Sequence, residues 1–550
     1  MKTEDRDLTP LVDLTAHPGT GPQRRRRPVY VDLLPPCNGA CPAGEDIQGW
    51  LAAAQAGRFR EAWEILVRDN PLPAVHGRVC YHPCETGCNR ADLDSSVSIH
   101  AVERFLGDLA NAERWAYPRP RPDNGRRVLV VGAGPCGLSA AYHLRRLGYG
   151  VEIRDAGVQA GGMLHFGIPA YRLPRAELRR EVERIEAMGV KITLGHRVDD
   201  VLAERAEGGF AAVFLALGAH LAKRVDIPAR DAGRVLDAVT LLHRVGAGER
   251  PRLGRRVVVY GGGNTAMDAA RTARRLGAED AVILYHRDRS RMSAHAFEAD
   301  EALAEGIRIQ WLSSVHDIDG ARVVVERMAI DDSGEPRPTG EMETLDADSV
   351  VLALGQRSDT EFLRGVPDLQ LLDDGSIAVN EAMMTGHPGL FAGGDATDGE
   401  RTVSSAVGQG KRAARHIDAW LRGSVYRPPP RHPPVSYDML HLELFTDAEQ
   451  SRQAEAPVAQ RLHGFSEVLA GLDAPQARYE ARRCLSCGNC FECDQCYAAC
   501  PEQAIEKLGP GRRYRVDYDR CTGCAVCFEV CPCHAIDMVS ESGTAPERPR

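Results

Sequence analysis

Short apolar runs alternate with amphipathic stretches over most of this chain. The runs at 128–131 and 256–260 are rich in β-branched residues, and each leads into a helical pattern, at 138–147 and 267–276. A buried strand that passes directly into a helix is typical of the opening of a βα unit. The pattern therefore predicts two α/β domains.

Three further apolar strands follow these openings. The strands at 212–216 and 349–353 each end in Leu-Gly, and a third lies within 389–395. This recurrence is expected when the chain crosses between two nucleotide-binding domains, one of which is inserted in the other. Helical patterns at 47–56 and 60–67 predict a separate helical unit ahead of both.

The first βα opening carries the motif Gly132-Ala-Gly-Pro-Cys-Gly137 between its strand and its helix. In such a motif Gly132 permits the turn, Gly134 lets a pyrophosphate approach the backbone, and Gly137 allows close packing of the helix. The helix N-terminus supplies amide donors to the phosphates. Asp155, at the end of the next strand, has the spacing of the carboxylate that accepts ribose hydroxyls.

The second βα opening carries Gly261-Gly-Gly-Asn-Thr-Ala266 in the same context. Gly261, Gly263, Asn264 and Thr265 are therefore predicted to bind a second dinucleotide. The next strand ends not in an acidic residue but in His-Arg, at Arg287, with further arginines close behind. Cations at the ribose position favour a 2′-phosphate, so the motif favours NADP(H) over NAD(H).

The chain has 17 cysteines, crowded towards its two ends. Near the C-terminus the spacing CxxCxxCxxxCP occurs twice, as in bacterial ferredoxins with two [4Fe–4S] clusters. Zinc would not require this spacing. In ferredoxins the fourth cysteine of each run binds the other cluster, which predicts two ligand sets: Cys490, Cys493, Cys496 and Cys531, and Cys521, Cys524, Cys527 and Cys500.

Composition is that of an α/β protein, with 43% hydrophobic and 26% charged residues in a chain of 550. The net charge of −9 gives no reason to expect nucleic acid as a partner. The basic run at 24–27 is interpreted as a solvated tail, with a docking arm for an acidic partner as the alternative. We see neither a secretory leader nor an apolar run long enough to span a membrane, so we expect a cytoplasmic protein.

Together these motifs resemble a known family, the small (β) subunit of NADPH-dependent glutamate synthase and its relatives. The relatives include the N-terminal half of dihydropyrimidine dehydrogenase and the large subunit of NADH-dependent reduced ferredoxin:NADP oxidoreductase. The likeness covers residues 35–420. It rests on the two glycine motifs and on four further segments: Gly77-Arg-Val-Cys80, Cys84-Glu-Thr-Gly-Cys88, Gly161-Gly-Met-Leu-His-Phe-Gly-Ile-Pro-Ala170, and Gly393-Gly-Asp395 with Ala406-Val-Gly-Gln-Gly410.

The resemblance implies FAD at the first glycine motif and NADPH at the second. It also implies roles at the flavin for Gly162, Gly394 and Asp395, and for a helix that begins near Val403. Together with the proline-rich stretch after residue 425 and the cysteine spacing, it gives this expected organisation: a polar tail (1–30), a helical [4Fe–4S] domain (31–122), an FAD domain (123–255 and 355–425), an NAD(P) domain (256–354), a linker (426–479) and a ferredoxin-like α+β domain (480–540).

The resemblance also implies two clusters in the helical domain, but one ligand segment stands elsewhere. Relatives carry Glu-Ala-x-Arg-Cys-Leu-x-Cys shortly before a Cys-xxx-Cys-Pro motif. Here that segment is Glu480-Ala-Arg-Arg-Cys484-Leu-Ser-Cys487, near the C-terminus. We expect it to fold back, which gives two sets: Cys37, Cys88, Cys484 and Cys487, and Cys41, Cys80 and Cys84 with Glu103, where relatives place an oxygen ligand.

These expectations describe a flavoprotein with four [4Fe–4S] clusters. The function implied is hydride exchange between NAD(P)H and FAD, then one-electron transfer through the clusters to or from a ferredoxin. A separate catalytic subunit, such as a 2-oxoacid:ferredoxin oxidoreductase, could take the place of the ferredoxin. Two alternatives remain: a glutamate synthase small subunit, and a non-catalytic relay or assembly protein. No acid–base triad is expected, because hydride transfer needs none.

Overall fold

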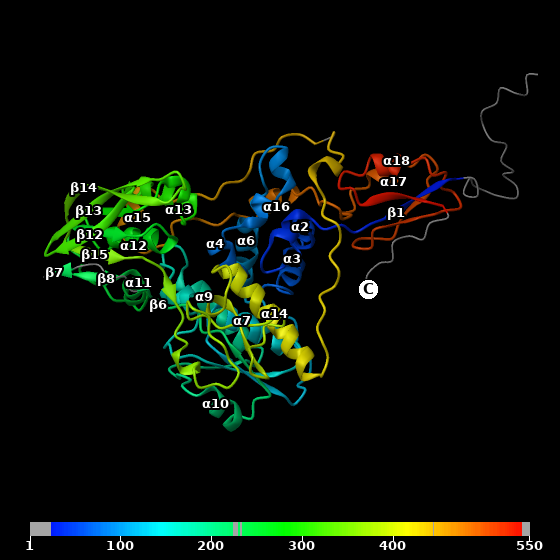
Figure 1. Ribbon diagram of the computed structural model, residues 1–550. Coiled ribbons are helices and arrows are strands. Elements are labelled where there is room, and N and C mark those ends of the chain that lie inside the picture. Colours follow the sequence, from blue (N-terminus) through cyan, green and yellow to red (C-terminus); the bar gives the residue numbers. More distant parts are fainter. Residues whose placement is uncertain (1–23, 224–228, 231–233, 444, 542–550) are drawn as a thin grey trace, which may run out of the picture.

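The computed structural model describes residues 24–223, 229–230, 234–443 and 445–541. Figure 1 shows two sheet-containing bodies, a group of short helices beside them, and a small unit, coloured red, at the far side. Residues 1–23 of the expected tail lie outside the described residues. Among the described residues, no helix is both long and apolar enough to cross a membrane.

The first body is built on five parallel strands in the order β17-β5-β2-β3-β4. The central strands are buried along most of their length, which explains their almost continuous apolar sequence. The strands are β2 (Arg127–Val131), β3 (Gly150–Arg154), β4 (Lys191–Thr193), β5 (Ala212–Leu215) and β17 (Leu390–Ala392). The helices are α7 (Pro135–Arg146), α8 (Met163–Phe166), α9 (Arg175–Glu186), α10 (Val201–Glu207) and α14 (Val403–Leu421).

The second body has its own sheet of five parallel strands, in the order β11-β10-β9-β15-β8. These are β8 (Val235–Asp237), β9 (Arg256–Tyr260), β10 (Asp280–Tyr285), β11 (Arg308–Trp311) and β15 (Ser349–Leu352). Its helices are α11 (Ala238–Gly246), α12 (Asn264–Arg275) and α13 (Ala296–Ala304). A second sheet packs on this body, formed by β7 (Ala229–Arg230), β12 (Ser313–Asp319), β13 (Arg322–Ile330) and β14 (Pro336–Asp346).

The chain crosses between the two bodies at a short antiparallel pair, β6 (Leu221–Ala222) with β16 (Gln356–Arg357). The prediction of two Rossmann-like domains, one inserted in the other, is confirmed. The inserted body begins earlier than residue 256, however, because β8 pairs with β15 and α11 follows β8. A strand of three residues is too short to show an apolar period, which is why the sequence missed it.

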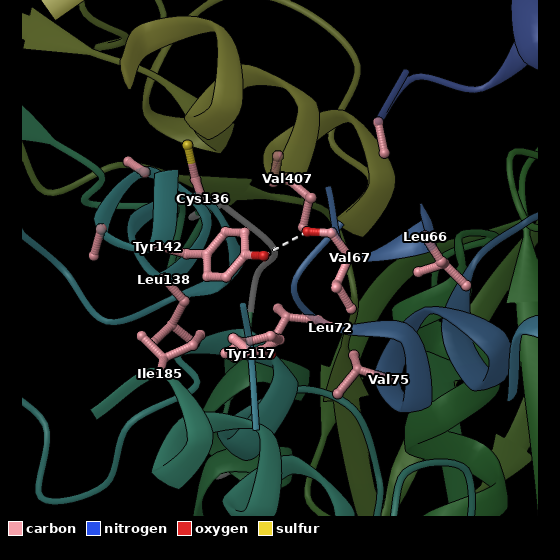
Figure 2. Packing of buried hydrophobic residues seen from close by; sticks show 14 of the residues in the cluster. Leu66, Val67, Leu72, Val75, Tyr117, Cys136, Leu138, Tyr142, Ile185 and Val407 are labelled. Carbon is pink, nitrogen blue, oxygen red and sulfur yellow. Dashed lines mark hydrogen bonds between the residues drawn. The ribbon is translucent and has the colours of Figure 1, made fainter. Parts of the chain in front are cut away.

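The helical unit consists of α1 (Pro36–Ala40), α2 (Ile47–Gln55), α3 (Phe59–Leu66), α4 (Pro73–Val79), α5 (Pro83–Thr86) and α6 (Ile99–Ala112). Its core is continuous with that of the first body, since one cluster of buried side chains extends through both. Figure 2 shows this junction, where the hydroxyl of Tyr142 on α7 donates to the carbonyl oxygen of Val67. The two units are therefore packed as one.

Helices α4 and α6 cross at two glycines. A Cβ at Gly77 would stand 2.3 Å from the backbone nitrogen of Arg104, and one at Gly107 would stand 2.3 Å from that of Ala74. Only glycine permits this separation of the two helices. The crossing brings the end of α4, which leads into Cys80, beside the face of α6 that carries Glu103.

The described part of residues 426–479, expected to be a linker, packs against the helical unit and, near Val468, against Tyr171 of the first body. The segment contains η7 (Tyr437–Met439) and α15 (Val458–Leu462), and α16 (Ala474–Arg482) begins near its end. The amide of Val435 donates to the carbonyl oxygen of Leu34 at 3.1 Å, and that of Ala448 donates to the Asp94 carboxylate at 2.9 Å. The segment thus brings the C-terminal cysteines back to the helical unit.

The small C-terminal unit contains α17 (Gln495–Ala499), α18 (Val526–Glu529), β18 (Ile505–Lys507), β19 (Tyr514–Val516) and β20 (Ile536–Ser540). Its remaining strand comes from the other end of the chain, since β1 (Arg26–Tyr30) pairs antiparallel with β20. The interpretation of residues 24–30 as part of a solvated tail is therefore wrong. The Arg24 side chain is largely buried and pairs with Glu541 at 2.7 Å.

Candidate functional site

A cavity of about 600 Å³ lies between the two glycine motifs. Residues of both motifs reach it, together with two residues of the helical unit, Val79 and Tyr81. Of the residues predicted to bind dinucleotides, the following line the cavity: Gly132, Gly134, Asp155, Gly162, Asn264, Thr265, Gly394, Asp395 and Val403.

The first glycine motif has the geometry that its sequence predicts. Gly132 has φ +109°, and a Cβ there would stand 2.2 Å from the carbonyl oxygen of Ala216. A Cβ on Gly137 would stand 1.9 Å from the carbonyl oxygen of Gly132. At Gly134, by contrast, no atom lies within 4 Å of the Cβ position, which opens towards the cavity. The cradle therefore fits a pyrophosphate at the N-terminus of α7.

Asp155 stands at the end of β3, where its carboxylate accepts the amides of Ala133 and Gly157, each at 2.6 Å. These bonds fix the carboxylate at the rim of the cavity, in the position expected of a ribose ligand.

The opposite wall of the cavity is formed where α14 begins. Thr402 caps the helix by accepting the amide of Ser405 at 3.1 Å, so that Val403 faces the cavity. Asp395 also lines this wall, and burial raises the pKa of its carboxyl. The amide of Gly394 donates to the Gln409 side chain at 2.7 Å, which ties this loop to the helix.

The second glycine motif also folds as expected. Gly261 has φ +143°, and a Cβ there would stand 2.3 Å from the carbonyl oxygen of Ala353. Gly263 precedes α12, and Asn264 and Thr265 at the start of that helix face the cavity. Arg287 does not line the cavity, since its guanidinium pairs with Glu335 at 3.0 Å. To bind a 2′-phosphate, Arg287 would have to break its ion pair with Glu335.

The first set of cysteines in the helical unit brings together distant parts of the chain. The thiol of Cys37 is buried, and its pKa is raised chiefly by that burial and then by its neighbours Cys484, Cys88 and Cys487. The carbonyl oxygen of Arg483 accepts from the Arg90 guanidinium at 3.2 Å, which holds the returning segment in place. The structure therefore brings together the four thiols that the sequence assigns to one set.

A second set lies deeper, around Cys80. Burial is again the main cause of the raised pKa values of Cys41 and Cys80, and the pKa of Cys80 is about 12. The neighbours that raise both pKa values further include Glu45 and Glu103, and in the case of Cys41 they also include Cys80. Cys84 has Cys80 and Cys41 among its neighbours. The arrangement therefore contains three thiols and two carboxylates, of which Glu103 is the one expected from the sequence.

Glu103 is not the only buried carboxylate here. Asn70 donates its side-chain amide to Glu45 at 2.9 Å and to Glu103 at 2.8 Å. The imidazole nitrogen Nδ1 of His76 lies 3.8 Å from Glu45 and 3.7 Å from Glu103. Sequence reasoning missed Glu45, because an acidic residue shortly after Cys41 carries no signal of burial.

Cys80 joins the second set to the cavity. Its neighbours in the chain, Val79 and Tyr81, both line the cavity, as does Val403 at the start of α14. The next residue of that helix, Ser404, donates its hydroxyl to the sulfur of Cys80 at 2.9 Å. One turn of α14 therefore contacts the cavity and this cysteine set at once.

In the C-terminal unit the cysteines follow the exchanged pattern of a two-cluster ferredoxin. The neighbours that raise the pKa of Cys490 include Cys496 and Cys531, after the main effect of burial. In the same way the neighbours of Cys521 include Cys500 and Cys524. Cys493 and Cys524 are exposed, whereas the other cysteines of this unit are partly or fully buried.

Two nucleotide motifs on one cavity, with cysteine sets beside it, define a flavin- and nicotinamide-dependent oxidoreductase. Comparison with known proteins indicates the same class of enzyme. Residues 126–410 match the pyridine nucleotide-disulphide oxidoreductase family, residues 32–115 match domain II of dihydropyrimidine dehydrogenase with its 4Fe–4S cluster, and residues 477–538 match a 4Fe–4S dicluster domain. The chain belongs to the pyridine nucleotide-disulphide oxidoreductase family and is an FAD-dependent NAD(P)H oxidoreductase with iron–sulfur domains.

Relatives of this chain include subunits of larger enzymes. The chain is 38% identical to the β subunit of NADP⁺-dependent formate dehydrogenase of Moorella thermoacetica, over 82% of this chain and 70% of that protein. It is 36% identical to the β subunit of NADPH-Fe(3+) oxidoreductase of Geobacter sulfurreducens, over 82% and 75%. It is 32% identical to the NADPH glutamate synthase small chain of Azospirillum brasilense, over 72% and 88%. The expected family resemblance is confirmed.

We expect Gly137→Ala and Gly134→Ala to act differently on the first nucleotide site. The Gly137 methyl would collide with backbone, so this variant should lose FAD and unfold more easily, by about 1–3 kcal/mol or more. The Gly134 methyl would enter open cavity, so this variant should keep the thermal stability of the apoprotein and lose only FAD affinity. FAD titration and thermal unfolding of the apoproteins measure both effects. Normal FAD binding by the Gly137 variant would contradict the assignment.

Proposed function

We propose that this chain is the FAD-containing subunit of an NAD(P)H:ferredoxin-type oxidoreductase with four [4Fe–4S] clusters. It exchanges electrons with a ferredoxin or with a separate catalytic subunit, such as a 2-oxoacid:ferredoxin oxidoreductase. The observation that carries this proposal is the position of Cys80, between two cavity-lining residues and within 2.9 Å of Ser404 on α14. When bound, FAD and NAD(P)H would supply hydride exchange, and the clusters would supply one-electron transfer.

The residues of the chain bind and orient these groups. The cradle of Gly132, Gly134 and Gly137 would receive the FAD pyrophosphate, and Asp155 its ribose. Asn264 and Thr265, at the N-terminus of α12, would receive the phosphates of the nicotinamide coenzyme. The N-terminus of α14 at Val403 places a partial positive charge at the cavity wall, which favours a negative charge on the flavin.

Four groups of side chains would hold the clusters. The donor sets consist of thiols brought together from distant segments, with one carboxylate, and thiolates are the usual ligands of such clusters. The proposed sets are Cys37, Cys88, Cys484 and Cys487; Cys41, Cys80, Cys84 and Glu103; Cys490, Cys493, Cys496 and Cys531; and Cys500, Cys521, Cys524 and Cys527.

The relatives support a partner subunit. Two of the relatives named above are β subunits, of a formate dehydrogenase and of an iron(III) oxidoreductase, so each works with another chain. The alternative of a glutamate synthase small subunit is disfavoured by the dicluster match at 477–538, which suits delivery of single electrons. The alternative of a non-catalytic relay is disfavoured by the open cavity between the two glycine motifs.

Anaerobic stopped-flow mixing of the purified protein with NADPH, and separately with NADH, tests this proposal. We expect bleaching of the flavin absorbance, then loss of cluster absorbance, and then reduction of added benzyl viologen. No bleaching with either coenzyme would favour the non-catalytic relay instead. NADPH oxidation that requires glutamine and a large partner subunit would favour the glutamate synthase alternative.

Arg287→Gln tests the preference for NADP(H). If Arg287 leaves Glu335 to bind the 2′-phosphate, its loss should remove a hydrogen bond to a charged group, which contributes about 1.5–3 kcal/mol. The KM for NADPH should rise about tenfold or more, with kcat and the KM for NADH unchanged. Arg308→Gln, which breaks the exposed pair with Asp280, is a matched control. An unchanged KM for NADPH would exclude Arg287 as a ligand.

A further inference from the structure

The small C-terminal unit, here called the dicluster unit after its match to a 4Fe–4S dicluster domain, is incomplete without residues from the other end of the chain. Strand β1 pairs with β20 along its full length, and the amide of Val31 continues the ladder to the carbonyl oxygen of Ala535 at 3.0 Å. The hydroxyl of Tyr518 donates to the carbonyl oxygen of Pro28 at 2.9 Å. A Cβ on Gly523 would stand 2.2 Å from the carbonyl oxygen of Arg26, so the cysteine loop is fitted closely to this strand.

The last residue of β1, Tyr30, reaches into the cysteine-rich core of the unit. Its ring stacks near that of Tyr514, with centroids 6.4 Å apart and planes 22° apart. Its hydroxyl oxygen lies 3.4 Å from the sulfur of Cys496. Cys490, of the same proposed set as Cys496, and Cys527, of the other set, lie farther away but still act on the hydroxyl. The hydrogen-bond contact of Tyr30 is with Cys496, a ligand of one of the two proposed cluster sites.

We propose that Tyr30 is a positioning residue that raises the reduction potential of the cluster held by Cys490, Cys493, Cys496 and Cys531. This inference rests on the ligand set of the proposed function. A ligand thiolate carries no proton, so the phenol hydroxyl is the donor in its contact with Cys496. A hydrogen bond to a ligand sulfur stabilises the more negative, reduced state of a cluster, and a partly buried site strengthens the effect.

The two cluster sites of the unit differ in this respect. The sulfurs of Cys500 and Cys521 accept only backbone amides among the described residues, those of Ala504 at 3.3 Å and Gly523 at 3.4 Å. The set around Cys496 has a comparable amide, since Ala535 donates to Cys531 at 3.3 Å. The thiol of Cys533 also lies 3.8 Å from the sulfur of Cys531, so the two sites already differ. The hydroxyl of Tyr30 adds a further donor on the same side, at a different ligand, and its share of the difference in potential is what its removal measures.

The cluster site that Tyr30 contacts is the one that lies next to the helical unit. Beyond Tyr30 the chain passes to the helical unit, where the amide of Leu33 donates to the carbonyl oxygen of Gly488 at 3.1 Å. Gly488 stands between Cys487, assigned to a cluster of the helical unit, and Cys490, assigned to the cluster beside Tyr30. The tuned site is thus the one at the junction of the two cysteine-rich units.

Tyr30→Phe in the full-length protein tests the proposal, by redox titration monitored with electron paramagnetic resonance (EPR) under anaerobic conditions. We expect the midpoint potential of one cluster to fall, the other potentials to stay, and the iron content to equal that of the wild type. Tyr518→Phe is the matched control, because it removes a hydroxyl that donates to the same strand and, among the described residues, makes no hydrogen bond to a ligand sulfur.

Three results would overturn the role of Tyr30: unchanged potentials in the Phe variant, the same shift in the Tyr518 control, or loss of iron from the Tyr30 variant. The last would make the contact structural rather than tuning. Absence of any dicluster signal in the wild-type protein would overturn the proposed ligand set itself, which distinguishes the two failures.

Discussion

Replacing Cys484 and Cys487 with serine should remove one cluster from the helical unit, about four of roughly sixteen irons, and leave the dicluster unit loaded. The reason is that these thiols lie beside Cys37 and Cys88, although in the sequence they directly precede the ferredoxin-like cysteine runs. A cluster left with two of its four cysteine ligands should not be retained during purification. Iron analysis per flavin and EPR of the reduced protein measure the loss.

The control for this experiment changes the same loop without removing a sulfur. Ser486 lies between the two cysteines, is buried, and accepts the side-chain amide of Gln48 at 3.3 Å. Ser486→Ala should keep the full iron content. If the double cysteine variant lost only signals of the dicluster unit, the assignment of these thiols to the helical unit would be wrong.

Gly408→Ala should slow the transfer of electrons from the flavin to the clusters by tenfold or more. A Cβ at this position of α14 would stand 2.0 Å from the carbonyl oxygen of Pro42 and 3.2 Å from the Cα of Ala43, so either the helix or the loop after Cys41 must move. The same helix carries Ser404, which donates to Cys80, so a displacement separates the cavity wall from that cysteine set.

Stopped-flow absorbance resolves the two phases of this reaction. With NADPH, the Gly408 variant should bleach its flavin at nearly the wild-type rate and reduce its clusters slowly, with a loss of about 1–3 kcal/mol in the free energy of unfolding. Gly365→Ala is a matched control, because its methyl would meet no atom within 4 Å. Equal cluster reduction in both variants would show that the contact between α14 and Pro42 does not matter for the coupling.

The sequence predicted those parts of the site whose chemistry is local. The glycines of both motifs are required within a few residues of the strand and helix that they join, so Gly132, Gly137 and Gly261 could be assigned without a structure. The ferredoxin spacing is equally local. The position of Arg287 is different, because whether it faces the coenzyme depends on Glu335, which comes from a separate strand.

The features that the sequence missed depend on partners far away in the chain. Strand β1 reads Arg-Arg-Pro-Val-Tyr, which shows no strand pattern, and it is ordered because β20 pairs with it. The proline-rich start of residues 426–479 predicts a linker, but contacts such as that between Ala448 and Asp94 attach the segment to the helical unit. Burial of Glu45 likewise depends on Asn70 and on the packing of the unit.

The reciprocal exchange of segments between the two cysteine-rich units also constrains the order in which the chain matures. Strand β1 is synthesised early, but its partner β20 becomes available only after it has left the ribosome. In the same way, Cys37 and Cys88 can complete their proposed cluster site only after Cys484 and Cys487 have been synthesised. Contacts of such large sequence separation form slowly, because a long loop must close first. Cluster insertion at these sites is therefore expected to follow completion of the chain rather than to accompany its synthesis.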